Sequence, residues 1–276
     1  MSLFIASLNS GSNGNCYYVG NKQEAVLIDA GISCRETEKR MKLAGLDIKK
    51  VKAIFVTHEH TDHVRGLHGL SFKYNIPVYG SEATLNKCPY FLNTAARKFF
   101  TTGESVAVGK LIITSFEKHH DASDPCSFVV QHEGVHVGVM TDIGRVCEQV
   151  LHHFKLCHAV FLEANYDEKM LEHGSYPYHL KKRIRGGSGH LSNAEALTLF
   201  KLHRSPFLSH LLLSHVSKEN NTPQIVYDAF APHADDVHVV VASRYKPSEV
   251  YEINSSVKSV LPRIKYARGV EQLSLF

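Results

Sequence analysis

Short apolar stretches alternate along this chain with polar segments, many of them containing glycine. Residues 51–56 are rich in β-branched residues and predict a buried strand, and residues 64–74 have the apolar spacing of a helix. Similar apolar runs predict further strands at residues 1–5, 112–116, 135–140, 160–163, 211–214 and 249–253. Because strands and helices alternate throughout, the pattern predicts one α/β domain over residues 1–253.

A cluster of polar residues follows the predicted strand at 51–56. The segment 57–63 reads THEHTDH and places three imidazoles and a carboxylate on a loop between strand and helix. Such a loop can direct His58 and His60 toward one metal ion. It can direct Asp62 and His63 toward a second. Imidazole nitrogen and carboxylate oxygen are the ligands of hydrolytic metal sites.

Composition narrows the class of protein only moderately. The chain has 276 residues, of which 43% are hydrophobic and 21% charged, as in ordinary globular domains. Its net charge of +4 is compatible with nucleic-acid binding without requiring it. We see no signal peptide, no apolar run of membrane-spanning length and no C-x-x-C pair among six cysteines. We therefore expect reduced thiols, a cytoplasmic location and no membrane partner.

The spacing His-x-His-x-Asp-His resembles the signature of the metallo-β-lactamase superfamily. This resemblance implies a four-layer αββα sandwich with two divalent metal ions held between its sheets. Zinc, manganese and iron would all suit such ligands. Asp29, at the end of a strand, is implied to orient the metal-binding loop. The implied ligands are His58, His60 and His120 for one ion, Asp62, His63 and His215 for the other, and Asp142 shared. His119 is the alternative to its neighbour His120.

The second half of the chain favours phosphodiester substrates. The strand at 160–163 ends in Glu163, and a glycine-rich loop leads through His190 to a helix whose start has a capping box, Ser192 with Glu195. A histidine in this position resembles the RNase Z branch. The resemblance implies that Glu163 holds His190, which protonates the leaving oxygen. The alternatives are a helix-capping histidine and a glutamate at a surface strand end.

A narrower resemblance, covering about residues 1–253, is to the bacterial YycJ/WalJ-type (VicX) metallohydrolases. It rests on segments 10–15, 120–122, 163–165, 189–193 and 215–221. It implies a 5′→3′ exonuclease that acts on DNA and takes part in mismatch repair. Tyr166 stands where this group often has histidine. Too few residues separate Asp142 from His215 to hold the lid domain of β-CASP nucleases.

Two segments are candidates for substrate contacts. The loop containing Ser10, Ser12, Asn13 and Asn15 is expected to cradle a terminal phosphate, or to form only a tight turn. Residues 181–185 form a basic run ending in Arg185, which would neutralise a nucleic-acid backbone or form a solvated helix face. The helix that starts after Ser192 offers free N–H groups to phosphate.

The segment 254–276 is predicted to be a basic tail. Its last five residues resemble the peptide by which bacterial repair proteins bind the DNA polymerase sliding clamp, and the alternative is a tail that folds back on the protein. The residues that would make this contact are Gln272, Leu273, Leu275 and Phe276.

These observations together predict a dinuclear metal-dependent DNA exonuclease, with DNA as the polymeric partner and RNA as the alternative. Three alternatives stay open: an RNase Z-like endoribonuclease, a glyoxalase-II-like thioesterase, and a metal-stabilised scaffold that binds partners through its tail.

Overall fold

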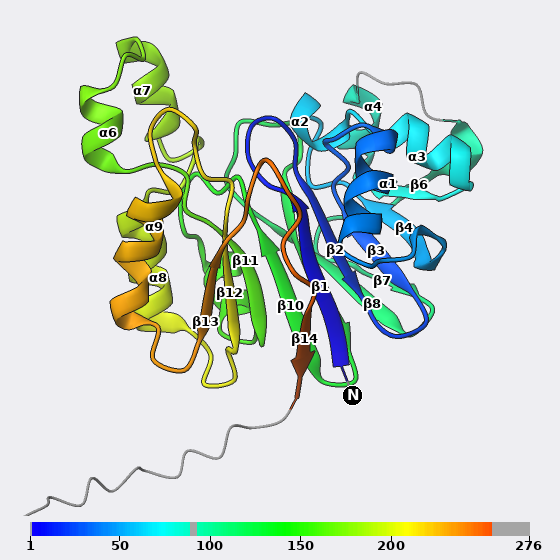
Figure 1. Cartoon of the computed structure of the whole chain (residues 1–276). Helices are drawn as coiled ribbons and strands as arrows, with labels where there is room; N and C mark the ends of the chain where they lie inside the picture. The colour runs from blue at the N-terminus through cyan, green and yellow to red at the C-terminus, as the bar shows by residue number, and fades with distance from the viewer. Residues whose placement is uncertain (1, 89–92, 256–276) are drawn as a thin grey trace, which may run out of the picture.

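The computed structural model of this chain describes residues 2–88 and 93–255. Two seven-stranded sheets lie face to face, and helices cover the outer face of each (Figure 1). This arrangement confirms the predicted four-layer αββα sandwich. The predicted clamp-binding residues Gln272, Leu273, Leu275 and Phe276 lie outside the described residues.

The first sheet has the strand order β14-β1-β2-β3-β4-β5-β6. Strands β1, β2 and β3 pair antiparallel, whereas β3 to β6 pair parallel. The strands are β1 (Ser2–Asn9), β2 (Cys16–Gly20), β3 (Ala25–Ile28), β4 (Val51–Phe55), β5 (Val78–Gly80), β6 (Arg97–Phe99) and β14 (Tyr251–Asn254).

The second sheet has the order β13-β12-β11-β10-β9-β8-β7. Strands β7 to β10 pair antiparallel and β10 to β13 pair parallel. The strands are β7 (Ser105–Val108), β8 (Leu111–Glu117), β9 (Cys126–His132), β10 (Val135–Met140), β11 (Ala159–Glu163), β12 (His210–Ser214) and β13 (His238–Val241). In both sheets the loops after parallel strands meet at one end, where α/β proteins commonly place their sites.

Three hydrophobic clusters correspond to the three interfaces between layers. One lies between the sheets and includes Phe55, Phe128 and Phe161, while the others lie beneath the outer helices. Helices on the first sheet are α1 (Cys34–Leu43), α2 (Thr61–Val64), α3 (Leu67–Tyr74) and α4 (Glu82–Lys87). The second half contributes α5 (Glu148–Phe154), α6 (Glu168–His173), α7 (Tyr178–Ile184), α8 (Asn193–His203) and α9 (Pro223–Phe230).

The helix predicted at 64–74 is interrupted near its start. Helix α2 ends at Val64 and α3 begins at Leu67, with Gly66 between them. The Gly66 N–H donates to the Ala30 carbonyl at 2.7 Å, and a Cβ on Gly66 would lie 2.0 Å from the Ile32 carbonyl oxygen. This close approach of two backbone segments fixes the end of the metal-binding segment against the loop that follows β3 and requires glycine.

None of the described helices is long and apolar enough to cross a membrane.

Candidate dinuclear metal site

Three of the predicted site residues adopt a left-handed backbone conformation at or just after the end of a strand. Asp29, Asp142 and His215 have φ values of 62°, 55° and 54°. They follow β3, β10 and β12, in loops at one end of the sandwich. Non-glycine residues rarely adopt positive φ, and those that do cluster at functional sites. This shared turn places all three among the buried side chains between the sheets.

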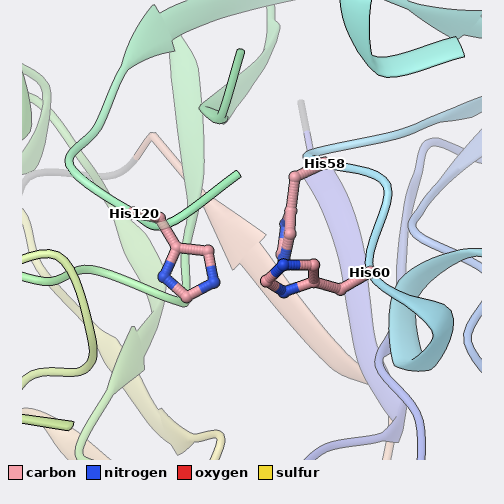
Figure 2. Close-up of side chains that lie close together, drawn as sticks. All are labelled: His58, His60 and His120. Atoms are coloured by element: carbon pink, nitrogen blue, oxygen red, sulfur yellow. The ribbon is translucent and has the colours of Figure 1, made fainter. Parts of the chain in front are cut away.

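The first group of candidate ligands, here called site one, consists of His58, His60 and His120. Each offers a ring nitrogen, and these atoms lie within 4.8 Å of one another. Figure 2 shows the three rings converging from two separate loops. His119, the alternative ligand, instead lies 3.3 Å from Arg145 through its Nε2 atom. The structure thus places His120, and not His119, in site one.

The second group, site two, consists of Asp62, His63 and His215, whose ligand atoms also lie within 4.8 Å of one another. Asp62 Oδ2 lies 3.5 Å from His63 Nε2 and 3.7 Å from His215 Nε2. Helix α2 carries Asp62 and His63, whereas His215 comes from the opposite sheet. The site is therefore formed only when both halves of the sandwich are folded together.

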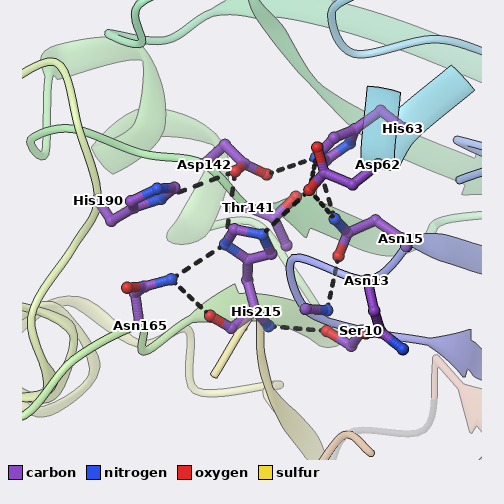
Figure 3. Close-up of polar contacts among 12 residues, drawn as sticks. Ser10, Asn13, Asn15, Asp62, His63, Thr141, Asp142, Asn165, His190 and His215 are labelled. Carbon is purple, nitrogen blue, oxygen red and sulfur yellow. Dashed lines mark hydrogen bonds and ion pairs between the residues drawn. The ribbon is translucent and has the colours of Figure 1, made fainter. Parts of the chain in front are cut away.

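Asp142 lies between the two sites. Its Oδ2 atom is 3.3 Å from His63 Nε2 in site two, and its Oδ1 atom is 3.9 Å from His120 Nε2 in site one. The side chain is almost fully buried. Figure 3 shows this carboxylate among the polar contacts of the site. Its position suits the bridging role expected of it.

Four of the histidines present the same atom to the centre. His58, His63, His120 and His215 bind a neighbouring protein group through Nδ1, which leaves Nε2 directed inward. Among the described residues, three of these Nε2 atoms and Asp142 Oδ2 are buried without a hydrogen-bond partner. Buried polar atoms without a partner are costly, so such a cluster is typical of residues that hold a cation. The residues present therefore fit two divalent metal ions.

The groups behind the imidazoles differ between the two sites. In site one, His58 Nδ1 lies 2.9 Å from the Thr57 hydroxyl, and His120 Nδ1 lies 3.0 Å from the Gly189 carbonyl. In site two, His63 Nδ1 lies 2.7 Å from Asp29 Oδ2, and His215 Nδ1 lies 3.0 Å from Glu163 Oε1. Site one is thus supported by neutral groups and site two by carboxylates.

The electrostatics follow this difference. Burial lowers the pKa of His58 well below its usual range and lowers that of His120 to about 4. Burial also acts to lower the pKa of His63, but Asp142 and Asp29 raise it well above its usual value. In the same way Asp142, and then hydrogen bonds to Asp62 and Glu163, outweigh burial and raise the pKa of His215 to about 10. Site two is the more negative environment.

Asp29 has the orienting position expected of it. Its Oδ1 accepts the Thr57 N–H at 2.8 Å, and its Oδ2 accepts the Thr57 hydroxyl at 2.9 Å in addition to His63 Nδ1. One fully buried carboxylate therefore fixes both the start of the metal-binding loop and the tautomer of a candidate ligand.

Glu163 and His190 lie beside the candidate ligands. Glu163 is fully buried at the end of β11, and its Oε1 lies 2.9 Å from His190 Nδ1. Its Oε2 accepts the backbone N–H groups of Ile143 and Leu191. Burial acts to raise the pKa of Glu163, but His190 and hydrogen bonds from both histidines lower it to about 2. The carboxylate is therefore ionised and orients both His190 and His215.

The residues predicted to bind substrate have varied settings. Ser12 and Asn13 are exposed in the β1–β2 loop. Ser10 and Asn15 are buried: Ser10 Oγ accepts the His215 N–H at 2.7 Å, and Asn15 Nδ2 lies 3.2 Å from Asp62 Oδ2. These two side chains therefore brace the candidate ligands, and direct contact with substrate stays a prediction for all four.

The remaining two candidates lie in the second half of the chain. Ser192 caps α8 in a complete capping box with Glu195, as its sequence context predicts. Arg185 Nη1 lies 2.7 Å from Glu172 Oε2 on α6. Substrate contact by either residue stays a prediction.

Sequence reasoning missed several supporting groups. Asn165 Nδ2 donates to the His215 carbonyl at 2.7 Å, and Thr57 and the Gly189 carbonyl hold His58 and His120. Glu59 accepts hydrogen bonds from the N–H and hydroxyl of Ser123. A polar residue next to a ligand was the available signal for Thr57 and Glu59, but a backbone carbonyl leaves no signal in a sequence.

Comparison with known proteins agrees with this fold. The model of the metallo-beta-lactamase superfamily matches residues 10–188. The structure is similar to that of the metallo-beta-lactamase fold protein YhfI from Bacillus subtilis, with a TM-score of 0.70 and 16% identity. The similarity covers 91% of this chain and 99% of YhfI. The chain therefore belongs to the metallo-β-lactamase superfamily and is a metal-dependent hydrolase.

Two curated relatives narrow this assignment. The chain is 32% identical over 269 residues to Exodeoxyribonuclease YycJ of Bacillus anthracis, covering 96% of this chain and 100% of the relative. It is 31% identical over 228 residues to Exodeoxyribonuclease WalJ of Streptococcus pneumoniae, covering 80% of this chain and 84% of the relative. Within the superfamily, this chain is a member of the YycJ/WalJ family, as the sequence motifs predict.

Proposed function

We propose that this protein is a dinuclear metal-dependent exonuclease that shortens DNA from the 5′ end and serves DNA repair. The observation that carries the proposal is the Glu163–His190 pair beside the ligand cluster, in a chain that matches an exodeoxyribonuclease over that relative's whole length. Glu163 orients His190 toward the site in addition to the candidate ligand His215. Hydrolysis of a β-lactam or a thioester offers no clear role for His190.

The proposed chemistry assigns distinct tasks to the residues described above. His58, His60 and His120 would hold one ion, Asp62, His63 and His215 the other, and Asp142 both. When bound, two such ions lower the pKa of a water nucleophile and neutralise charge on a phosphate. The chain's own contribution to the leaving group is His190. Because its Nδ1 donates to Glu163, its Nε2 is the atom available to protonate the departing oxygen.

Turnover of defined substrates tests the proposal. Single- and double-stranded DNA with 5′-phosphate, matched RNA and a thioester would each be incubated with Mn²⁺ or Zn²⁺. We expect stepwise shortening of DNA from the 5′ end, and loss of that activity in His60→Ala and His190→Ala. Preferential endonucleolytic cleavage of RNA would instead favour the hypothesis of an RNase Z-like endoribonuclease. Thioester turnover with inert nucleic acids would overturn the proposal, and no turnover at all would favour a scaffold.

Binding of segment 272–276 to the polymerase sliding clamp stays a separate prediction. Its test is a pull-down with purified clamp, in which deletion of 272–276 should remove binding. Unchanged binding after the deletion would end that prediction without affecting the proposed nuclease.

A further inference from the structure

The basic side chains of α7 and of the residue after it fall on two sides of the helix. Lys181 Nζ donates to the Glu172 carbonyl at 2.6 Å, and Arg185 pairs with the Glu172 carboxylate at 2.7 Å. Residues four apart share one face of a helix, so both cations turn back toward α6. The positive charges on this side of α7 therefore already have partners on α6.

The other side carries His179, Lys182 and Arg183, at the i, i+3 and i+4 spacing that places them together. All three are exposed, and they line a pocket of about 370 Å³ with Asp121, Gly186 and Ser188. Figure 1 shows α7 at the same end of the sandwich as α2 and the β1–β2 loop. The helix that carries most of the pocket's basic residues therefore lies at the end of the sandwich that carries the metal site.

A short chain of contacts connects this pocket to site one. Arg183 Nε lies 2.5 Å from Asp121 Oδ2, and Asp121 Oδ1 lies 3.5 Å from His120 Nε2. Gly189 directly follows the pocket residue Ser188, and its carbonyl accepts a hydrogen bond from His120 Nδ1. One carboxylate thus separates the Arg183 guanidinium from a candidate metal ligand. Lys182 and Arg183 against Asp121 leave the pocket with one surplus positive charge.

We propose that this pocket binds a backbone phosphate of the nucleic-acid strand, adjacent to the phosphate that is cleaved. The proposal rests on the proposed nuclease function. Arg183 supplies the planar fork that pairs with phosphate oxygens, and Lys182 supplies a point charge. Asp121 holds the Arg183 side chain over the pocket before substrate arrives. A phosphodiester anion then neutralises the surplus charge of the pocket.

Neighbouring lysines make a matched test possible. Lys182→Ala, Arg183→Ala and the charge-conserving Arg183→Lys would be compared with Lys181→Ala, which removes the same charge from the opposite side of α7. Each fully metal-loaded protein would receive a single-stranded DNA oligonucleotide and bis(p-nitrophenyl) phosphate, which has only one phosphate.

We expect Lys182→Ala and Arg183→Ala to raise KM for the oligonucleotide about tenfold more than Lys181→Ala does. Their loss of kcat/KM for the oligonucleotide should exceed their loss for the small diester by a similar factor. The slope of log kcat/KM against log salt should become shallower by about 0.7 for each lost phosphate contact on single-stranded DNA. Arg183→Lys should fall between wild type and Arg183→Ala.

Two failures are distinguishable. Equal effects of Lys181→Ala and Lys182→Ala on KM and on the salt slope would overturn the subsite and leave the nuclease proposal intact. If the wild type hydrolyses the small diester but neither cleaves nor binds the oligonucleotide, as measured by fluorescence anisotropy, the proposed function and the subsite both fail.

Discussion

The two candidate metal sites share one aspartate but differ in the groups that surround them. Site one consists of three imidazoles supported by a hydroxyl and a backbone carbonyl. Site two has Asp62 among its ligands, and carboxylates lie behind both of its imidazoles. A carboxylate behind an imidazole makes that ligand a stronger donor, and the added negative charge favours a divalent cation. The comparison predicts that affinity for metal is unevenly divided between the two sites, although both contain histidine ligands.

Removing the shared residue should have the largest effect, because it affects both sites at once. Asp142→Asn keeps the shape of the side chain but removes its charge. We expect weaker binding of both ions and a loss of nuclease kcat/KM on the order of 10³-fold, since bound metal supplies several kcal/mol of charge stabilisation. Metal content by mass spectrometry and DNA turnover would be measured together, with circular dichroism as the folding control. Retention of one fully bound ion would show that Asp142 serves a single site.

The order of metal loading tests the comparison directly. Metal-stripped protein would be titrated with Zn²⁺ against a chelator of known affinity. We expect two phases, the tighter belonging to site two, separated by about 10–100-fold in affinity because of the carboxylates behind its ligands. His60→Ala should lose the weaker phase and His63→Ala the tighter one. Loss of the tighter phase in His60→Ala and of the weaker phase in His63→Ala would show that site one binds metal more tightly than site two.

The carboxylate behind His63 can be neutralised without touching a ligand. Asp29→Asn retains an oxygen that can accept the Thr57 N–H, but it removes the negative charge 2.7 Å from His63 Nδ1. We expect the tighter phase to weaken by about tenfold, toward the lower end of the usual effect of such partners, with little change in the weaker phase. Equal weakening of both phases would mean that Asp29 supports the whole loop rather than His63.

These contrasts mark the limit of what the sequence can predict. The candidate ligands were predictable because four of them lie within the segment 57–63 and the others follow strands that the apolar pattern predicts. The supporting contacts made by distant loops were not predictable. The Gly189 carbonyl holds His120 of site one across 69 residues, and Asn165 holds His215 of site two across 50, so these contacts depend on how distant loops pack.

The same limit applies to the loop at residues 10–15. Its hydroxyl and amide groups suggested a phosphate cradle, but the structure turns Ser10 and Asn15 inward to the His215 backbone and the Asp62 side chain. The sequence indicated polar contacts for this loop but could not distinguish contact with a substrate from contact with the protein's own ligands, and contact with substrate stays a prediction. The α/β class was easier to predict, because it depends on apolar periodicity and not on single side chains, whereas the four-layer sandwich was implied by the resemblance of the segment 57–63 to a known superfamily.

The smallest expected effect belongs to Glu59, which connects the two loops of site one. Its Oε1 accepts the Ser123 N–H at 3.0 Å and also the Ser123 hydroxyl, so it ties the loop of His58 and His60 to the loop of His120. Glu59→Ala should weaken only the looser metal phase, by about three- to tenfold. A hydrogen bond to a charged group contributes about 1.5–3 kcal/mol, but only part of that loss reaches the metal site because neighbouring contacts remain. Glu59→Gln retains an acceptor oxygen and should lie closer to wild type. Zn²⁺ titration of both variants checks this, and weakening of the tighter phase would show that the two sites are not independently supported.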